Sequence, residues 1–247
     1  MSALVLALIA GAVVGLALGA LGGGGSVLAV PALIYLLGFS PSAATTASLI
    51  IVAATSATAL YAHARDGHVA WKAGSLFAAA GIIPAYLAGA AAGRVPETAL
   101  TVAFAVIAAL AAVRMFRPSS SRPPERIRTG KAAGAGAGLG AVTGFLGVGG
   151  GFLAVPALVS VLGLTMRRAV GTSLLVITVN SLAALVARTG TGGGLDWALI
   201  GPFTGAAILG AWDGKRLSTK VSGNSLQKVF AAVLLAVAVF MLIDVIA

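Results

Sequence analysis

The chain contains one segment twice. Residues 11–49 and 136–174 align without a gap at an offset of 125 positions, and 19 of the 39 aligned residues are identical. The agreement is closest between GALGGGGSVLAVPAL (19–33) and GFLGVGGGFLAVPAL (144–158), where a cluster of glycines precedes a Val-Pro pair. The chain is therefore built from two related halves, and a glycine cluster inside apolar sequence is repeated in both.

The composition is that of a protein embedded in a membrane. Hydrophobic residues make up 59% of the 247 residues, charged residues make up 9%, and the mean hydropathy is +1.06. No soluble globular class has this composition. The net charge of +10 lies in short loops between apolar segments, so we expect a lipid bilayer and no nucleic acid as its partner.

Ten apolar segments follow one another, five in each half, which predicts an all-α polytopic membrane protein. The polar, basic and Pro-rich stretch 117–131 separates an N-terminal repeat, 1–116, from a C-terminal repeat, 132–247. The segments are 3–21, 27–37, 43–62, 70–92, 97–116, 132–146, 152–163, 169–187, 195–212 and 226–246. The second and seventh are too short to span a bilayer at about 1.5 Å per residue, so they are expected to be broken or re-entrant half-helices.

The loop charges predict an orientation. If every segment reverses the side of the chain, only Arg94 and Arg188 lie on one side and the other 14 of the 16 cations lie opposite. The basic side should be cytoplasmic, which puts the linker 117–131 inside and both termini outside a cell (inner) membrane. Because five is odd, the second repeat should be inverted relative to the first, as in many secondary transporters.

The glycine clusters predict an anion site. Where a helix breaks and restarts, free N–H groups and the positive end of the helix dipole face the break, and this arrangement binds small anions. Ser26 could add a hydroxyl donor or an N-cap, and Pro31 and Pro156 should kink the short helices. The alternative is that small residues only allow close helix packing, which is the preferred explanation for Gly11, Gly15 and Gly19. The candidate ligand-binding positions are Gly22, Gly23, Gly24, Gly25 and Ser26 in the first half and Gly147, Gly149, Gly150 and Gly151 in the second.

A polar stripe is also repeated. Ser48 and Thr55 match Ser173 and Asn180, and a spacing of seven residues places each pair on one helix face. Together with Thr172 at a helix entrance, these side chains could coordinate the oxygens of a substrate. Structural hydrogen bonding within the helices is the alternative for each residue taken alone.

The apolar segments lack charged residues near their centres. A carboxylate proton relay, a metal site or a cofactor is therefore not expected. His63 and His68 are interpreted as residues of an interfacial loop, with a gating or pH-sensing role as the alternative. Asp213, close to Lys215 and Arg216, is interpreted as part of a surface ion pair.

The paired motif resembles the TauE/SafE family of sulfite and organosulfonate exporters over nearly the whole chain. The resemblance implies a bacterial-type inner-membrane permease for small sulfur oxyanions or sulfonates. It carries over to Gly22, Gly24, Gly25 and Pro31, and to Gly147, Gly149, Gly150, Gly151 and Pro156. The first motif has Ser26 where the second has Gly151, so the two halves need not contribute equally.

These observations together predict a secondary transporter, not an enzyme, that exports a small sulfur-containing anion by alternating access. An intramembrane phosphatase would need buried acids or an Arg clamp near the break, which the sequence does not offer. A passive anion channel, or an import permease for thiosulfate-like or carboxylate anions, remains the alternative. A homodimer is an open possibility for the assembly.

Overall fold

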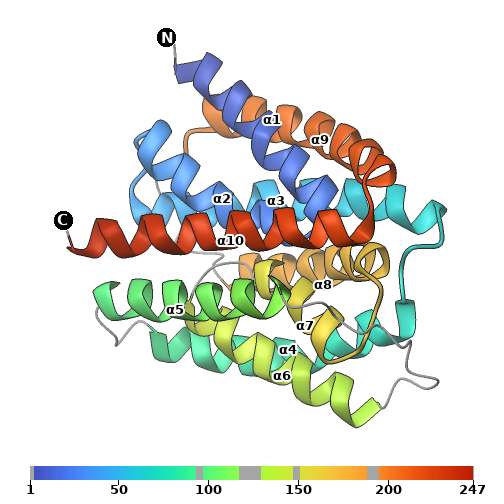
Figure 1. The fold of residues 1–247 in the computed structure, drawn as a ribbon. Coiled ribbons are helices and arrows are strands. Elements are labelled where there is room, and N and C mark those ends of the chain that lie inside the picture. The colour runs from blue at the N-terminus through green and yellow to red at the C-terminus, as the bar shows by residue number, and fades with distance from the viewer. Residues whose placement is uncertain (1–2, 93–96, 117–128, 147–150, 188–194, 247) are drawn as a thin grey trace.

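The computed structural model describes residues 3–92, 97–116, 129–146, 151–187 and 195–246 of the chain, and this part is helical without a strand. It contains ten α-helices and one short π-helix, η1, which directly continues α2 (Figure 1). In chain order they are α1 (Ala3–Leu21), α2 (Gly24–Pro31), η1 (Ala32–Leu36), α3 (Pro41–Arg65), α4 (Trp71–Ala92), α5 (Glu97–Phe116), α6 (Thr129–Leu146), α7 (Gly151–Ser160), α8 (Met166–Ala187), α9 (Trp197–Lys220) and α10 (Gly223–Ile246).

Within the described residues, four helices are long and apolar enough to cross a membrane: they contain the stretches Ala3–Leu21, Ala43–Arg65, Met166–Val186 and Gly223–Phe240. Their outward faces carry large apolar side chains. Ile9 and Val13 of α1 are more than half exposed, as are Val186 of α8 and Ile243 of α10. Side chains of this kind are stable on a surface that contacts lipid.

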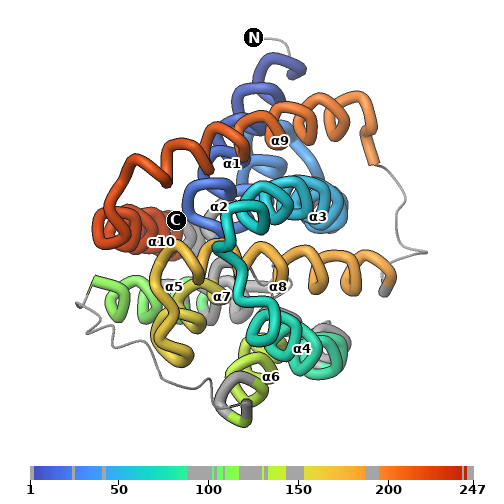
Figure 2. Tube along the Cα trace, turned by 90° about the vertical axis from the view of Figure 1, so that its right-hand side faces the viewer, coloured from blue at the N-terminus to red at the C-terminus, as the bar shows by residue number. Residues whose placement is uncertain are grey.

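The two halves are interleaved. The first helix of each half packs along the fourth helix of the other, so that α1 pairs with α9 and α4 pairs with α6. Corresponding helices of the two halves also pack on each other: α3 with α8, α5 with α10 and, less extensively, α2 with α7. Both views show α1 and α9 on one side of the molecule, α4 and α6 on the other, and α3 and α8 between them (Figures 1 and 2). Helices α1, α4, α6 and α9 therefore each pack most extensively against a helix of the other half.

Glycines allow the two outer pairs to approach closely. A Cβ atom added to any of the glycines on the inner faces of α1 and α6 would overlap the backbone of the facing helix. This confirms close packing as the explanation for the spaced glycines of α1. Gly11, Gly15 and Gly19 face Phe203, Ala207 and Ala211 of α9, and Gly136 and Gly140 face Phe77 and Gly81 of α4.

The ninth helix is longer than its apolar segment predicts. The apolar run ends at residue 212, but α9 continues to Lys220. Consequently Lys215 and Arg216 lie on a helix and not in a loop. The end of α3 lies beside them, because Asp66, its C-terminal cap, forms an ion pair with Lys215 at 2.7 Å.

Candidate anion-binding site at the broken helices

The first break lies between α1 and α2. Helix α1 ends at Leu21, Gly22 adopts the left-handed conformation with φ +69°, and Gly23 is the N-cap of α2. Only glycine adopts this φ without strain. A Cβ atom at Gly22 would also lie 2.5 Å from the hydroxyl of Ser173 and 3.2 Å from the Cα atom of Val170. The glycine break of the first half thus contacts α8 of the second half, at a residue of the predicted polar stripe.

Of the two roles predicted for Ser26, hydroxyl donor or N-cap of α2, the N-cap is wrong. Gly23 occupies the cap position and provides no side-chain hydrogen bond. Ser26 lies inside the first turn, where its buried hydroxyl donates to the Gly23 carbonyl at 2.7 Å. The first N–H groups of α2 therefore have no side-chain acceptor at the cap, and this is the arrangement that favours a bound anion.

The prolines of the two short helices α2 and α7 have different effects on the backbone. Pro31 ends α2, and the chain continues as the π-helix η1, because proline supplies no N–H group to continue the α-helical ladder. Pro156 lies inside α7, which remains α-helical to Ser160. Of the second glycine cluster, Gly151 begins α7, whereas Gly147, Gly149 and Gly150 lie outside the described residues.

The hydroxyls of the polar stripe donate to their own helices. Ser48 donates to Thr45 O at 2.8 Å, Thr55 to Ile51 O at 2.6 Å, and Ser173 to Val170 O at 2.8 Å. All three side chains are buried. In this arrangement the proton of each hydroxyl is used within the helix, and only the oxygen lone pairs remain to accept a hydrogen bond. Each hydroxyl must therefore rotate away from the backbone to donate to an anion.

Thr172, predicted to line the substrate site, forms a hydrogen bond to the backbone of a distant segment. Its hydroxyl oxygen accepts a hydrogen bond from the Ala70 N–H at 3.0 Å, and the residue is fully buried. It therefore fixes the chain just before α4 begins at Trp71. Because its oxygen is the acceptor in this bond, its own proton remains available to donate.

Unsatisfied polar atoms lie where α3 crosses α8. The Ser56 and Thr178 hydroxyls join the two helices at 2.9 Å. Close to this bond along α8, Asn180 Oδ1 and the hydroxyl of Ser181 are buried without a hydrogen-bond partner among the described residues. Repeat symmetry explains Ser181: it corresponds to Ser56, but the position that corresponds to Thr178 is Ala53, which has no hydroxyl. Buried polar atoms of this kind are normally satisfied, so they indicate a place for a ligand or water.

The sequence interpretation of His63 as a loop residue is wrong. Helix α3 continues to Arg65, which places His63 against the end of α1 with only 3% of its surface exposed. Its Nε2 atom lies 3.2 Å from the carbonyl oxygen of Gly19, three residues before the break. A signal was present in the sequence, because His63 follows Ser56 by seven residues and so shares its helix face.

Comparison with known proteins identifies the family. The family model described as Sulfite exporter TauE/SafE matches residues 7–241. The chain belongs to the TauE/SafE family. It is 34% identical over 243 residues to a protein of Xylella fastidiosa (strain 9a5c) named "Probable membrane transporter protein", covering 94% of this chain and 92% of that protein. A protein of the same name from Xylella fastidiosa (strain Temecula1 / ATCC 700964) is 33% identical with the same coverage. No solved structure matches the chain.

Family membership and the apolar helices make this TauE/SafE chain a multi-pass membrane transporter. Both the family description and the names of the relatives describe transport and not catalysis. The glycine breaks of this TauE/SafE protein are therefore assessed as binding sites.

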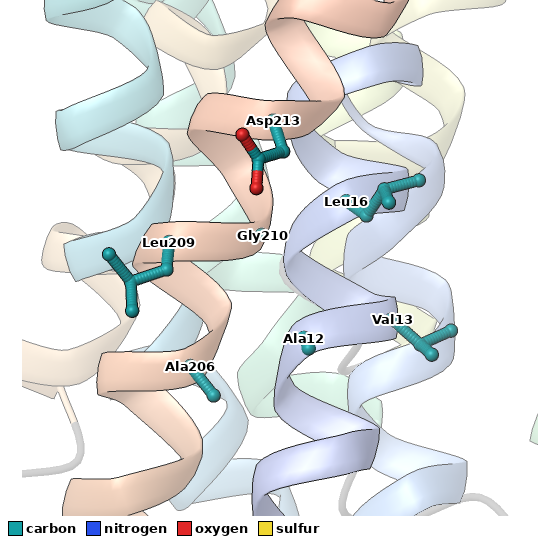
Figure 3. A pocket seen from close by; sticks show the side chains of 7 residues that line it. All are labelled: Ala12, Val13, Leu16, Ala206, Leu209, Gly210 and Asp213. Atoms are coloured by element: carbon teal, nitrogen blue, oxygen red, sulfur yellow. The ribbon is translucent and has the colours of Figure 1, made fainter.

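Two surface cavities border α9. One, of about 310 Å³, is an apolar groove between α1 and α9 lined by Ala12, Leu16 and Gly210, with Asp213 at its end (Figure 3). Asp213 pairs with Arg216 at 3.3 Å, both well exposed, which confirms the predicted surface ion pair. A groove whose one charged lining group is a carboxylate does not suit an anion.

The second cavity is basic. It has a volume of about 470 Å³ and lies between the end of α3 and α9. Its lining residues are Tyr61, Ala62, Arg65, Asp66, Trp212, Lys215 and Arg216. In this TauE/SafE chain the cavity lining includes Ala62, the residue before the buried His63 on α3.

Proposed function

We propose that this protein is a secondary transporter that exports a small sulfur-containing anion, sulfite or an organosulfonate, by alternating access. The family description, sulfite exporter, supports the substrate class. The observation that carries the proposal is the contact of Gly22 with Ser173. It brings the uncapped N-terminus of α2 next to the polar stripe of α8, so that helix-end N–H groups and polar side chains face a common place.

The anion would be held by both glycine clusters. In the first half these are Gly22 to Gly25 with Ser26, and in the second half Gly147 and Gly149 to Gly151. Ser48, Thr55, Thr172, Ser173 and Asn180 would complete the shell. Asn180 suits this role because its amide oxygen is buried without a partner, and rotation of the amide can present the NH2 group instead.

Alternating access would use the inversion of the two repeats. The pairing of α1 with α9 and of α4 with α6 is what a two-fold axis relating the halves would produce. Rocking of one set of pairs against the other about α3 and α8 would open the glycine breaks to one side at a time. In this proposal the protein lies in the cell (inner) membrane with its linker in the cytoplasm and both termini outside.

Flux into and out of proteoliposomes tests the proposal. Purified protein should carry sulfite, thiosulfate and methanesulfonate with saturation and should discriminate against sulfate and a matched carboxylate. Voltage and the pH gradient are set separately, because voltage alone contributes about 2.3 kcal/mol per charge per 100 mV. Absence of flux for every sulfur anion in folded protein would refute the proposal.

Substitution of Asn180 provides a local test. Asn180→Ala should raise the half-saturating anion concentration about tenfold, because a hydrogen bond to a charged group contributes about 1.5–3 kcal/mol and a tenfold change is about 1.4 kcal/mol. Thr58→Ala is the matched control, since the Thr58 hydroxyl bonds only to carbonyls of its own helix. Equal half-saturating anion concentrations in the two variants would show that Asn180 does not bind the anion.

A passive channel or an import permease would use the same helix ends. A channel would show flux that does not saturate, and anion on the far side would not accelerate it. A carrier that alternates should instead be stimulated by substrate on the far side.

A further inference from the structure

His63 differs from every other buried polar residue that the structure describes, because it alone can change its charge near neutral pH. The other buried polar side chains are serine and threonine hydroxyls and the amide of Gln227. An ionisable side chain buried within a membrane helix is costly and marks a functional site. His63 has no part in the function proposed above.

The hydrogen bond of His63 fixes its tautomer. The Gly19 carbonyl only accepts, so Nε2 of the neutral ring carries the hydrogen and donates to it at 3.2 Å. Nδ1 then carries the lone pair, and it is buried without a partner in the described part of the chain. A proton has a free place to bind on this ring. Gly19 belongs to the last turn of α1, whose negative helix end favours a cation.

His63 lies within reach of the glycine break. A Cβ atom on Gly171 would lie 3.4 Å from the Cβ atom of His63. Gly171 precedes Ser173 by two residues, and Ser173 is the residue that contacts Gly22. One side of His63 thus contacts α1 just before the break, and another contacts α8 beside the polar stripe.

The charged and titratable groups around His63 lie at the end of α3, on α9, at His68 and on α8. Asp66 lies one turn later at the end of α3 and is paired with Lys215 of α9 at 2.7 Å. The ring of His68 lies 6.1 Å from the ring of His63. Helix α1 has no titratable side chain, and the nearest on α8 are Arg167, which donates to Thr219 O of α9, and its neighbour Arg168. Because Asp66 is already paired with Lys215, a proton on His63 would lack a free carboxylate partner.

We propose that His63 binds a proton together with the anionic substrate, so that one proton crosses the membrane with each anion. The inference rests on the proposed transport function. An anion at the N-terminus of α2 supplies the negative charge that the imidazolium lacks, and the imidazolium in turn raises the affinity for the anion by the same factor. In this proposal Nδ1 exchanges its proton, as the site opens, with water of the basic cavity, whose lining includes Ala62, the residue before His63. On the far side, the proton returns to water with the anion.

The charge balance gives a distinctive signature. A monovalent anion and one proton together carry no net charge. Transport of methanesulfonate should therefore follow the pH gradient and not the voltage. In a cell that produces a strong acid, this protein would export the anion and the proton together.

The test uses His63→Gln. Glutamine keeps an amide N–H that can donate to Gly19 O but cannot be protonated near neutral pH. Methanesulfonate and thiosulfate are the probes, because both stay ionised between about pH 5 and pH 8, where histidine titrates, and so cannot carry the proton themselves. In wild-type proteoliposomes a gradient of about one pH unit at zero voltage should accumulate methanesulfonate about tenfold, because one proton crosses with each anion. An internal pH dye should report one proton per anion.

H63Q should bring methanesulfonate only to equal concentrations on the two sides, with no proton movement. His68→Gln is the matched control and should behave as wild type. H63Q that still accumulates the anion with a proton, or wild type that carries it without one, would overturn the inference while the transport function stands. Absence of flux for every sulfur anion, sulfite included, would overturn both.

A measurement on wild type alone guards against a variant that does not fold. Calorimetric binding of methanesulfonate and of thiosulfate in two buffers of different ionisation enthalpy counts the protons taken up. About one proton per anion is expected at neutral pH, and zero would overturn the inference.

Discussion

At the scale of the residue, Gly22 combines two constraints that can be separated. Its φ of +69° disfavours any side chain, and the space where a Cβ atom would lie is taken by Ser173 and Val170. Gly38 has nearly the same φ, +71°, but open space around it. The two glycines therefore have equal backbone requirements and different surroundings.

This comparison predicts different costs for the same substitution. Gly38→Ala should lower the free energy of unfolding by about 1–2 kcal/mol from backbone strain alone. Gly22→Ala should lower the free energy of unfolding by about 1–3 kcal/mol more than Gly38→Ala does, because the added methyl group overpacks against α8. It should also weaken anion binding. Thermal unfolding in detergent measures both, and equal losses would show that the contact with α8 is dispensable.

The residue scale also explains why the site was only partly predictable. The positions of the glycines and of the polar stripe followed from the repeat. Burial of His63 did not, because it depends on α3 continuing to Arg65 and on the end of α1 lying beside it. The carbonyl acceptors to which the Ser48, Thr55 and Ser173 hydroxyls donate within their own helices are likewise visible only in the folded chain.

At the scale of the element, the packing of α1 on α9 depends only on the glycines that lie in the contact between the two helices. Gly15 lies against the backbone of Ala207, whereas Gly201 and Gly205 of α9 have nothing within 4 Å of an added Cβ atom. A glycine in a helix is otherwise unfavourable relative to alanine by about 1 kcal/mol.

Alanine substitutions should therefore have opposite signs on these faces. Gly15→Ala, and Gly140→Ala in the α4–α6 pair, should each lower the unfolding free energy by about 1–3 kcal/mol because the helices must separate. Gly201→Ala and Gly205→Ala should be neutral or stabilising by up to about 1 kcal/mol. A stable Gly15→Ala protein with an unchanged melting temperature would contradict this packing.

At the scale of the whole molecule, the Asp66–Lys215 ion pair joins the first half to the second. The hydrogen bond from the Lys215 ammonium holds the pKa of the Asp66 carboxyl below its usual value. The stability from this pair is fully present above the usual carboxyl pKa and is lost as the pH falls through the lowered one. Both side chains are partly exposed, so the contribution should be about 1 kcal/mol or less.

Removal of the carboxylate should reduce the sensitivity to acid. Asp66→Asn should unfold at a slightly lower temperature than wild type at neutral pH, and the difference should vanish in acid. Melting curves from neutral pH to about pH 3 measure this, with Asp213→Asn as the control because its ion pair is highly exposed. A gap that stays constant with pH would contradict the assignment.

Interleaving of the halves predicts how the chain tolerates being divided. Residues 1–116 alone should not form a stable protein, because α1 and α4 lack their partners α9 and α6. The same applies to residues 132–247. The two pieces expressed together should assemble and copurify, whereas a stable isolated half would show that the contacts between halves are not required.

The sequence by itself determined the two-fold repeat, the helical membrane class, the family and the places where the helices break. These features depend on local chemistry: apolar runs, glycine clusters and loop charges act over a few residues. Only the tertiary structure decided that α1 pairs with α9 across the repeat, that Gly22 contacts Ser173, and that His63 is buried against Gly19. Each of these contacts joins segments far apart in the chain, and no local pattern specifies which distant backbone will occupy the space beside a glycine.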